Sequence, residues 1–560
     1  MIRYIRWQII LVVTGVALLA TLLIYVALNF STVWVPARGG TYVEGVAGTP
    51  RYLNPLLSNQ YVVDGDLCAL LFDGLTKLDE RGEVVPDLAL RWEVSDDGLT
   101  YTFELRQNAR WHDGRPVTAD DVLFTVRLLQ DPDFPGSPDL STLWRSVKVE
   151  KEGLWTVRFT LQQPFAPFLD YTTIGLLPAH ILEGVTAAQL PDHPFNRQPV
   201  GTGPFRLVEI ATEEGEPAYA ILEANRQFYG PVPMLDRIQF KFYPSDQAVV
   251  RAYEAGEVAG IGHVPPSALA WARTNPSLNL FTLPLAGYTL VFLNLRNDEV
   301  PFLQTPEVRR ALLYALDRQA LIDEVLDGQG IVAHSPILPG TWAYNPEVRK
   351  YRLNRERTVA LLKEDGWQPS TSSESEWPTG WTKEGRPLAF SLLTADDPQQ
   401  VALAEAMAKQ WATVGIQVSV EAVPPTDLQD RLTARQFQAL LVELILPGDP
   451  DPYPFWHQTQ IEEGQNYAGY DSRDVSEWLE EARQTTDRRR RRELYWLFQE
   501  RFAEDVPSLL LYHPVYNYAV DQSVRGVEVG PLNRPGDRFR SVASWYIQLR
   551  RVIRSEASAR

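Results

Sequence analysis

Cysteine and histidine are both scarce in this sequence. Among 560 residues there is one cysteine, Cys68, and there are seven histidines. A single thiol can neither close an internal disulfide nor supply a cysteine-based metal site, and the histidines show no paired ligand spacing. Cys68 lies in the apolar run Leu67 to Phe72, so we interpret it as a small core residue. We therefore expect no metal and no cofactor.

Basic charge is in deficit as well. The chain carries 53 Lys and Arg against 71 Asp and Glu, which gives a formal net charge of -18. A field of this sign repels phosphate polyanions, whereas nucleic-acid binding needs a basic surface. We therefore expect no nucleic-acid partner. At about 100 to 200 residues per domain, the length predicts about three folding units.

Compact catalytic motifs are absent too. The sequence contains no Gly-x-Ser-x-Gly elbow, no His-Glu-x-x-His helix and no Gly-rich phosphate loop. These are the local patterns that serve acyl transfer, metal hydrolysis and nucleotide use. We predict that the chain is not an enzyme. One alternative stays open, a membrane-anchored hydrolase whose two distant carboxylates meet only in the folded chain.

Long apolar runs are missing except near the N-terminus. Trp7 to Phe30 is uncharged and nearly all apolar, and as a helix at about 1.5 Å per residue it could cross a hydrocarbon core of about 30 Å. Arg3 and Arg6 precede it, which places the first residues in the cytoplasm. We expect residues 1–38 to form a transmembrane anchor and the remainder to lie at the extracytoplasmic face of the cell membrane. A cleaved signal peptide is the competing interpretation.

Strand and helix patterns alternate through the remaining chain. Period-two alternation of apolar residues predicts strands at Tyr101 to Leu105 and at Trp155 to Leu161. Thr118 and Asp121 form a capping-box pattern, which predicts a helix that begins just after Thr118. The mixture indicates an α/β fold class.

Other segments carry weaker local signals. Thr305 and Asn354 are each placed to cap a further helix. The stretch Gln368 to Thr382 is rich in Ser, Thr and Pro and predicts an exposed loop, and residues 551–560 predict a polar tail. Five consecutive arginines, Arg488 to Arg492, predict a solvated helix face with ion pairs three or four residues apart.

A set of ordered motifs indicates a family. Tyr101 to Val122 combines a strand, an aromatic-x-Asp-Gly turn and a helix opened by Thr-Ala-Asp-Asp. It occurs in order with Leu53-Asn-Pro55, Val200-Gly-Thr-Gly-Pro-Phe205, Asn225 to Asp236 and Asp505-Val-Pro507. Together these segments resemble the family of extracytoplasmic solute-binding proteins that includes the dipeptide-, oligopeptide- and nickel-binding components of ABC importers, of the bacterial family 5 type.

The resemblance implies a two-lobed, periplasmic-binding-protein-like fold of the class II, three-subdomain type, with a hinged cleft that encloses a ligand when the lobes close. The expected domains are an anchor at 1–38, a first-lobe core at 39–75, 203–285 and 515–550, a subdomain inserted into that lobe at 76–202, a second lobe at 286–514, and a tail at 551–560.

The resemblance also implies a function. A monomeric ectodomain would bind a peptide-like ligand between its lobes and deliver it to the permease and ATPase subunits of an ABC importer. The same fold binding a non-peptide solute, such as a sugar, an opine or a metal chelate, is an alternative, and so is a binding module used for sensing without transport.

One departure from the family pattern concerns the ligand's charge. Peptide-binding members pair the ligand backbone as an added strand and bind its ammonium with an aspartate just upstream of an Asp-Pro dipeptide. Aligning Gly448 to Asp451 with the family's Gly-Asp-Pro-Asp puts Leu446 at that aspartate's position. The acidic side chains that could replace it are Glu443, Asp449 and Asp451.

The other expected ligand contacts come from both lobes. Four residues match first-lobe positions that face the ligand in the family, and four second-lobe aromatics lie near predicted loops, where rigid rings with polar tips suit a cleft. These expected contacts are Asn59, Tyr61, Gly262, His263, Tyr288, Trp342, Tyr344 and Trp456.

Overall fold

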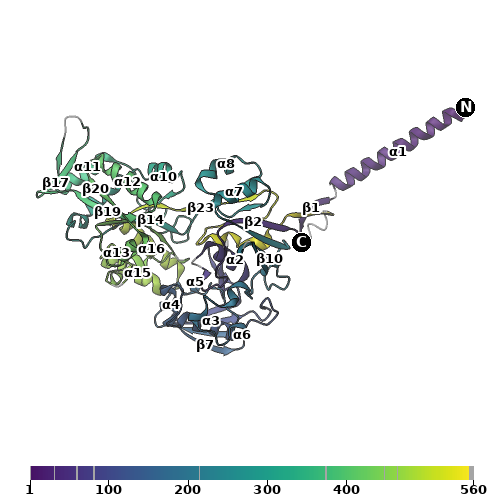
Figure 1. The fold of residues 1–560 in the computed structure, drawn as a ribbon, viewed down its shortest axis with the longest axis horizontal. Helices are drawn as coiled ribbons and strands as arrows, with labels where there is room; N and C mark the ends of the chain where they lie inside the picture. Colours follow the sequence, from purple (N-terminus) through teal and green to yellow (C-terminus); the bar gives the residue numbers. More distant parts are fainter. Residues whose placement is uncertain are drawn as a thin grey trace.

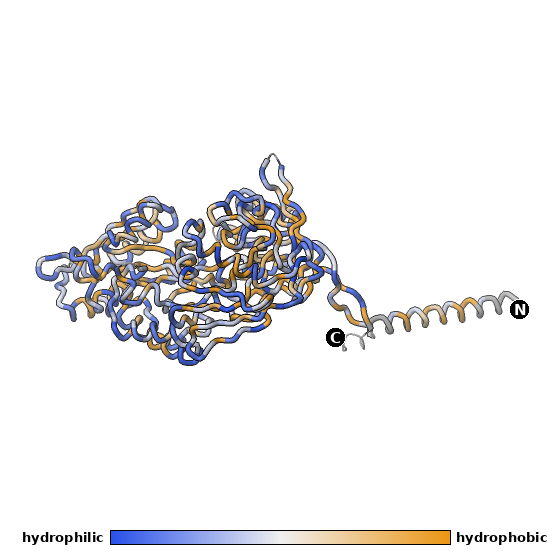
Figure 2. The backbone as a smooth tube through the Cα atoms, turned by 90° about the horizontal axis from the view of Figure 1, so that it is seen from below, coloured by the Kyte–Doolittle hydropathy of each residue, from blue (hydrophilic) through white to orange (hydrophobic). Residues whose placement is uncertain are grey.

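The computed structural model arranges the chain as two bodies joined by crossing strands, with one long helix projecting from the first body (Figure 1). Apolar residues run through the interior of both bodies, while the outer turns are polar (Figure 2). The structure describes residues 2–30, 32–58, 61–79, 82–213, 215–371, 375–446, 448–462 and 464–553.

The projecting helix, α1 (Ile2–Phe30), stands clear of both bodies (Figure 1). Its apolar side chains are exposed, with 66% of Trp7 and 67% of Leu11 open to solvent. Over the described residues, no helix combines the length and the hydropathy needed to cross a membrane. The transmembrane helix predicted at Trp7 to Phe30 is therefore not supported.

A two-stranded ribbon links α1 to the first body. Strand β1 (Thr32–Ala37) pairs antiparallel with β24 (Gln548–Ile553) from the other end of the chain, and the Arg551 guanidinium lies 5.3 Å from the centroid of the Trp34 ring. The first residues of the predicted tail thus belong to a strand, and residues 554–560 lie outside the described part of the chain.

A seven-stranded sheet forms the core of the first body, in the order β13-β23-β12-β2-β11-β10-β9. The central strand β2 runs parallel to both β11 and β12. Its strands and helices are β2 (Thr41–Ala47), α2 (Val62–Leu71), β9 (Phe205–Glu213), β10 (Glu216–Ala224), β11 (Arg237–Tyr243), α7 (Asp246–Glu254), β12 (Gly260–Ile261), α8 (Leu269–Thr274), β13 (Leu278–Pro284) and β23 (Val515–Asp521).

A subdomain inserted between α2 and β9 has its own antiparallel sheet, ordered β5-β6-β8-β7, beside the hairpin of β3 and β4. Buried and partly exposed residues alternate along β6, as the sequence predicts. Its elements are β3 (Thr76–Leu78), β4 (Val84–Pro86), β5 (Ala89–Val94), β6 (Thr100–Leu105), α3 (Ala119–Gln130), α4 (Pro138–Arg145), β7 (Lys148–Gly153), β8 (Thr156–Thr160), α5 (Phe168–Tyr171) and α6 (Ala179–Leu182).

The second body is built on a six-stranded sheet ordered β15-β22-β14-β21-β19-β20. One face packs against α9 to α12 and the other against α15 and α16. Its elements are β14 (Gly287–Leu293), α9 (Pro306–Tyr314), α10 (Arg318–Val325), β15 (Ile331–Val332), α11 (Arg355–Glu364), β16 (Gln368–Ser370), β17 (Gly380–Lys383), β18 (Arg386–Pro387), β19 (Ala389–Ala395), α12 (Pro398–Ala412), β20 (Gln417–Val423), α13 (Pro425–Thr433), β21 (Ala439–Ile445), α14 (Tyr453–Trp456), α15 (Arg473–Gln484), α16 (Arg488–Asp505) and β22 (Ser508–His513).

Local capping signals predicted several helix starts correctly. The Thr118 main-chain N–H donates to Asp121 Oδ2 over 2.8 Å at the start of α3, completing the capping box. Helix α9 begins after Thr305, and the Asn354 side chain accepts a hydrogen bond from the Arg357 N–H at the start of α11. These starts depend on side chains close in sequence, which is why sequence alone finds them.

Two local predictions need correction. The stretch 368–382 is not wholly an exposed loop, because β16 and β17 pair within it and Trp381 is buried, with its indole N–H donating to the Val414 carbonyl over 2.7 Å. The arginines 488–492 do not all lie on a solvated face, because Arg491 turns inward and is only 8% exposed. Both errors arise because distant partners lie outside any local sequence window.

The chain passes between the two bodies at two adjacent places. β13 leads into β14 through Leu285 and Ala286, and β22 leads into β23 through Pro514. The Leu285 N–H donates to the Pro514 carbonyl over 2.9 Å, and the Ala286 N–H donates to the Leu532 carbonyl over 2.8 Å. The two crossings therefore form one hydrogen-bonded unit.

A buried ion cluster ties the ends of the chain into the first body. The Arg538 guanidinium donates to both carboxylate oxygens of Asp66 over 2.6 Å and to Glu44 Oε1 over 2.7 Å. Arg538 and Glu44 are fully buried, and Asp66 is 1% exposed. Because the cluster joins strand β2, helix α2 and the C-terminal segment, it connects parts of the chain that are far apart in sequence.

Replacing the buried cation should destabilise the first body strongly. Arg538→Met leaves two buried carboxylates without their partner, and we expect a loss of about 3 to 5 kcal/mol in the free energy of unfolding. Urea-induced unfolding followed by tryptophan fluorescence measures this. The control is Arg91→Met, which breaks the exposed pair with Glu104 and should cost below about 1 kcal/mol. Equal losses of unfolding free energy in the two variants would contradict the structural role of the Arg538 cluster.

Candidate functional site

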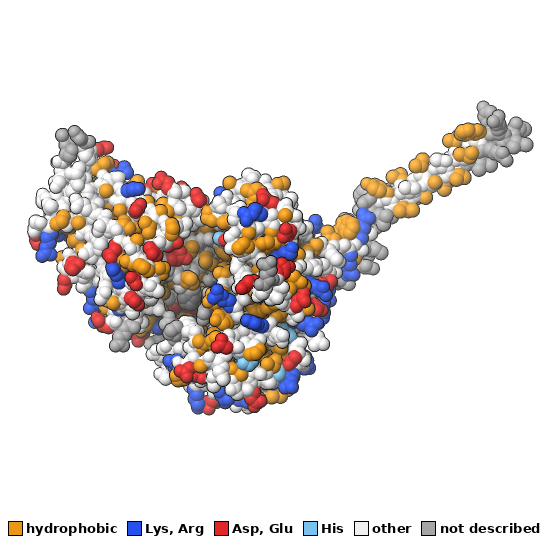
Figure 3. Space-filling model, viewed as in Figure 1, with side chains coloured by type: hydrophobic (Ala, Val, Ile, Leu, Met, Phe, Trp, Pro, Cys, Tyr) orange, Lys and Arg blue, Asp and Glu red, His pale blue; other side chains and the backbone are white. Residues whose placement is uncertain are grey.

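A hollow separates the two bodies on the side where α16 faces α2 (Figure 3). One wall of the hollow belongs to each body. Of the expected first-lobe contacts, Asn59 lies outside the described residues.

Tyr61 lies at the N-terminal end of α2, in the first body. Its hydroxyl accepts a hydrogen bond from Arg51 Nη1 over 3.2 Å, and the Arg51 guanidinium lies 4.7 Å from the ring centroid. The ring also lies 6.0 Å from the ring of Tyr52. Tyr61 is thus held in place while its side chain stays partly exposed.

Gly262 and His263 follow β12 in the first body. The Gly262 carbonyl accepts a hydrogen bond from the Tyr516 hydroxyl, and a side chain at Gly262 would come within 2.8 Å of Val46. The His263 ring pairs with Asp246 through Nδ1 over 2.7 Å and lies 5.5 Å from the Tyr516 ring. Its side chain is 38% exposed, so it remains open to a ligand.

Tyr288 and Trp456 lie in the core of the second body. Tyr288 is 1% exposed and Trp456 is fully buried. The Tyr288 ring packs edge-on against His513, and Trp456 packs against Phe292 and Phe502. This packing gives both aromatics a structural role.

Trp342 and Tyr344 lie beside the arginine-rich end of α16. The Trp342 ring is flanked by the guanidinium groups of Arg488 and Arg491, at 4.9 and 5.1 Å from its centroid. The Tyr344 carbonyl accepts a hydrogen bond from the Trp496 indole N–H over 3.1 Å. Both side chains remain partly exposed.

Asp449 and Asp451 are occupied by ion pairs within the second body. The Arg491 guanidinium donates to Asp449 Oδ1 over 2.8 Å and to Asp449 Oδ2 over 3.0 Å, and Arg483 Nε donates to Asp451 Oδ2 over 2.8 Å. Both aspartates are below 10% exposed. Burial raises the pKa of the Asp449 carboxyl, and the charge of Arg491 opposes that rise.

The C-terminal end of α15 and the N-terminal end of α16 touch the inserted subdomain. The Ala166 N–H donates to the Arg483 carbonyl over 2.7 Å, and the Arg483 guanidinium lies 5.0 Å from the Phe165 ring centroid. Arg488 Nη2 donates to Glu83 Oε1 over 2.7 Å. The two bodies are therefore in contact here as well as at the strand crossings.

Glu443 occupies a different position, on β21. It lies opposite Thr289 of β14, and Thr289 lies opposite Tyr512 of β22. The Glu443 residue is exposed on the strand, and partial burial of its carboxyl raises the pKa. The sequence signal for this residue is a single charge within the apolar strand Ala439–Ile445.

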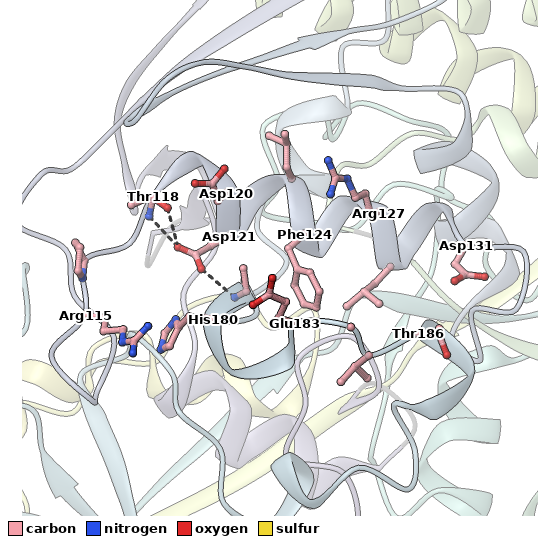
Figure 4. A pocket seen from close by; sticks show the side chains of 16 residues that line it. Arg115, Thr118, Asp120, Asp121, Phe124, Arg127, Asp131, His180, Glu183 and Thr186 are labelled. Atoms are coloured by element: carbon pink, nitrogen blue, oxygen red, sulfur yellow. Dashed lines mark hydrogen bonds between the residues drawn. The ribbon is translucent and has the colours of Figure 1, made fainter.

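A separate pocket of about 720 Å³ lies on the inserted subdomain, between α3 and α6 (Figure 4). Arg115, Arg127 and His180 lie around it, and Asp121 turns inward to accept the Ala179 N–H over 3.0 Å. Because every residue lining this pocket belongs to one subdomain, closure of the two bodies cannot enclose a ligand there. Within the described residues no cluster of three or more metal-ligating side chains occurs.

Comparison with known proteins decides the family. A sequence model of the bacterial extracellular solute-binding proteins, family 5, middle region, matches residues 83–467. The chain belongs to this family. Its two-lobed fold agrees with the α/β, periplasmic-binding-protein-like class expected from the sequence.

Relatives of this solute-binding protein cover nearly its whole length. The oligopeptide-binding protein AppA of Bacillus subtilis is 31% identical over 89% of this chain and 90% of its own. The dipeptide-binding protein of Escherichia coli is 27% identical over 90% of this chain and 95% of its own. AppA in complex with a nonapeptide superimposes with a TM-score of 0.68 at 28% identity, over 92% of this chain and 100% of that structure. NikZ of Campylobacter jejuni in complex with Ni(L-His) has a TM-score of 0.69 at 26% identity, over 90% and 99%.

The contact between the inserted subdomain and the second body of this solute-binding protein contains an unusual carboxyl group. Burial and the nearby negative charge of Asp449 raise the pKa of Asp170 to about 8. An aspartate in the unfolded chain has a pKa of about 4. Between these two values the folded protein retains a proton that the unfolded chain has lost, so this group lowers stability as the pH rises.

The variant Asp170→Asn should therefore flatten the pH dependence of stability. We expect it to unfold at a higher urea concentration than the wild type at pH 8, and at a similar concentration at pH 4. Unfolding curves across this range measure the difference, with Asp298→Asn, an exposed position in the second body, as the control. If the stability of Asp170→Asn falls with rising pH as steeply as that of the wild type, the raised pKa does not belong to Asp170.

Proposed function

We propose that this protein captures a peptide-like solute between its two bodies and delivers it to the permease of an ABC importer, whose ATPase subunits drive uptake. The observation that carries the proposal is the hollow between two bodies that the chain connects through two adjacent strand crossings, in a chain of the solute-binding family. The peptide class rests on the names of its relatives, among them AppA and the E. coli dipeptide-binding protein.

Closure would work through differential contacts. The open state exposes both walls, and a ligand that touches both favours the closed state only by the contacts that closure adds. The crossings at Leu285, Ala286 and Pro514 provide the hinge, and the contact between Arg483 and the inserted subdomain provides a stop on the closing side. The closed edges of the two bodies are the surface for the permease.

The ligand contacts that we propose come from both walls. Tyr61 and His263 contribute from the first body, next to Gly262, where close packing leaves room only for backbone. Trp342, Tyr344 and Glu443 contribute from the second body. We keep Asn59 as a proposed ligand contact on the evidence of the sequence alone. The buried residues Tyr288, Trp456, Asp449 and Asp451 are instead proposed to stabilise the second body behind the wall.

The family's amine-binding position is not acidic in this chain. Leu446 packs against the apolar cluster under α15 and α16, and its N–H donates to the Ala286 carbonyl over 3.1 Å. A ligand amine therefore has no carboxylate at that position.

Identification of a bound ligand tests this function directly. We expect the full-length protein, purified in detergent and then denatured, to release peptides detectable by mass spectrometry. Adding them back to ligand-stripped protein should produce heat in a calorimetric titration and return them chemically unchanged, because a binding protein only captures and releases its ligand. Release of a sugar, an opine or a metal chelate would replace the peptide assignment within the same fold. Cleavage of the added peptides would favour a hydrolase.

We further propose that α1 attaches the protein to the extracytoplasmic face of the cell membrane. Exposed apolar side chains along the helix support this. The full-length chain should sediment with membranes and resist a carbonate wash, whereas a chain that begins at Thr32 and keeps the β1–β24 ribbon should be found in the soluble fraction. A full-length protein that stays soluble would overturn the attachment.

A further inference from the structure

The β1–β24 ribbon carries basic charge on an otherwise acidic protein. Neither of its strands contains an acidic residue, although the chain as a whole has a net charge of -18. Arg550 and Arg551 lie on β24, and Arg38 follows β1 directly; all three, here called the ribbon arginines, are exposed. Within the described residues, the side chains of Arg38 and Arg550 form no ion pair and no hydrogen bond. Their charges are therefore open to an external anion.

The ribbon also exposes a large aromatic side chain. Trp34 is 61% exposed, and Arg551 lies directly opposite it on β24, with the guanidinium stacked on its ring. In the described part of the chain these two strands form a sheet by themselves, and a lone two-stranded ribbon is only marginally stable in water. Tryptophan beside basic residues is typical of the boundary between a membrane and water.

The ribbon lies next to the helix that we propose to attach to the membrane. Trp34 is four residues beyond Phe30, the last residue of α1, so the chain keeps it within about 14 Å of the helix end. In the space-filling view, the neck between the first body and α1 shows apolar and basic side chains (Figure 3). When α1 is attached to a bilayer, the ribbon is thus held at the level of the lipid headgroups.

We propose that the β1–β24 ribbon and Arg38 bind the headgroups of anionic phospholipids in the membrane to which α1 attaches. The ribbon arginines contact lipid phosphates, and the Trp34 ring lies among the headgroups. This binding rests on the proposed attachment of α1 and goes beyond it, because one helix alone leaves the protein free to turn about the helix axis. A second contact fixes which side of the first body faces the membrane.

The attraction is too weak to act without α1. Each arginine near an anionic surface strengthens association by about fivefold, salt screens the attraction beyond about 8 Å, and the same surface repels the acidic remainder of the chain. A chain that begins at Thr32 therefore stays in the soluble fraction. Once α1 confines the ribbon to the surface, binding becomes intramolecular and a weak attraction is sufficient.

A spin label on the ribbon tests its contact with lipid. The nitroxide is attached at Pro36→Cys, an exposed position on the same face as Trp34, or at Gln163→Cys, an exposed control position on the inserted subdomain. The native Cys68 is buried. Full-length protein is reconstituted into vesicles of phosphatidylcholine, with or without phosphatidylglycerol. Electron paramagnetic resonance then measures collisions of the label with a water-soluble nickel chelate.

We expect phosphatidylglycerol to shield the label at position 36 and not the label at position 163. The ratio of shielded to exposed label at position 36 should rise by about fivefold or more, the effect of one arginine at an anionic surface, and the rise should disappear at high salt. Equal shielding at position 36 in the two kinds of vesicle refutes the binding of anionic headgroups.

The decisive variant combines Arg38→Gln, Arg550→Gln and Arg551→Gln. It should lose the shielding that phosphatidylglycerol induces, and lysine at the same three positions should restore it, because lysine keeps the charge. A lysine variant that remains unshielded would show that the positive charge is not what binds, which overturns the proposal.

A matched control removes the same charge elsewhere. Arg110→Gln, Arg127→Gln and Arg145→Gln together alter three exposed positions on the inserted subdomain and should leave the shielding unchanged. If this control loses the shielding as well, net charge and not the ribbon is responsible.

Flotation of the vesicles separates this inference from the attachment of α1. Protein that floats with both kinds of vesicle while position 36 stays exposed refutes the ribbon contact and leaves the attachment standing. Protein that floats with neither refutes both.

Discussion

The arrangement of this molecule depends on one constraint: the chain passes between its bodies as two strands that are hydrogen-bonded to each other at the point of crossing. The bond from Leu285 to Pro514 keeps the crossings side by side, and each crossing connects a strand of the first-body sheet with a strand of the second-body sheet. The connection between the bodies therefore spans only a few residues, Leu285, Ala286 and Pro514. His513, next to the crossing, is buried, and burial lowers its pKa to about 4, so the imidazole is neutral at physiological pH. A neutral, packed crossing would let the proposed closure proceed without a charge moving into or out of water.

Charge is distributed differently on the two faces of the second-body sheet. On the side toward α15 and α16, Asp449 forms an ion pair with Arg491, and Asp451 forms one with Arg483. Arg483 in turn accepts a hydrogen bond from the inserted subdomain through its carbonyl. On the other face, Glu443 stands without a cation among the described residues. Acidic residues close together in sequence thus have different environments, because Asp449 and Asp451 are buried in ion pairs and Glu443 is exposed.

Local sequence carries most of the information on the elements and little on the site. The strands at Tyr101 and Trp155, the helix after Thr118, and the burial of Cys68 follow from periodicity and capping, which act over a few residues. The partners of Asp449 and Asp451 lie more than thirty residues away, so turn chemistry and ligand binding were both compatible with the sequence alone. The inward direction of Arg491 was hidden for the same reason. Glu443 was visible as a lone charge in an apolar strand, but its isolation depends on which helices cover the sheet, and that is settled only by the fold.

The ribbon of β1 and β24 determines how mechanical load enters the molecule. Strands that pair antiparallel over six residues resist a pull along their length in shear, with all of their hydrogen bonds sharing the force. Any force applied through α1 therefore reaches the first body at the junction of both chain ends. With α1 held at a surface, the first body would be the fixed reference frame and the second the free arm. Closure can then be followed from a single fluorophore on the second body, measured against a surface to which α1 is immobilised.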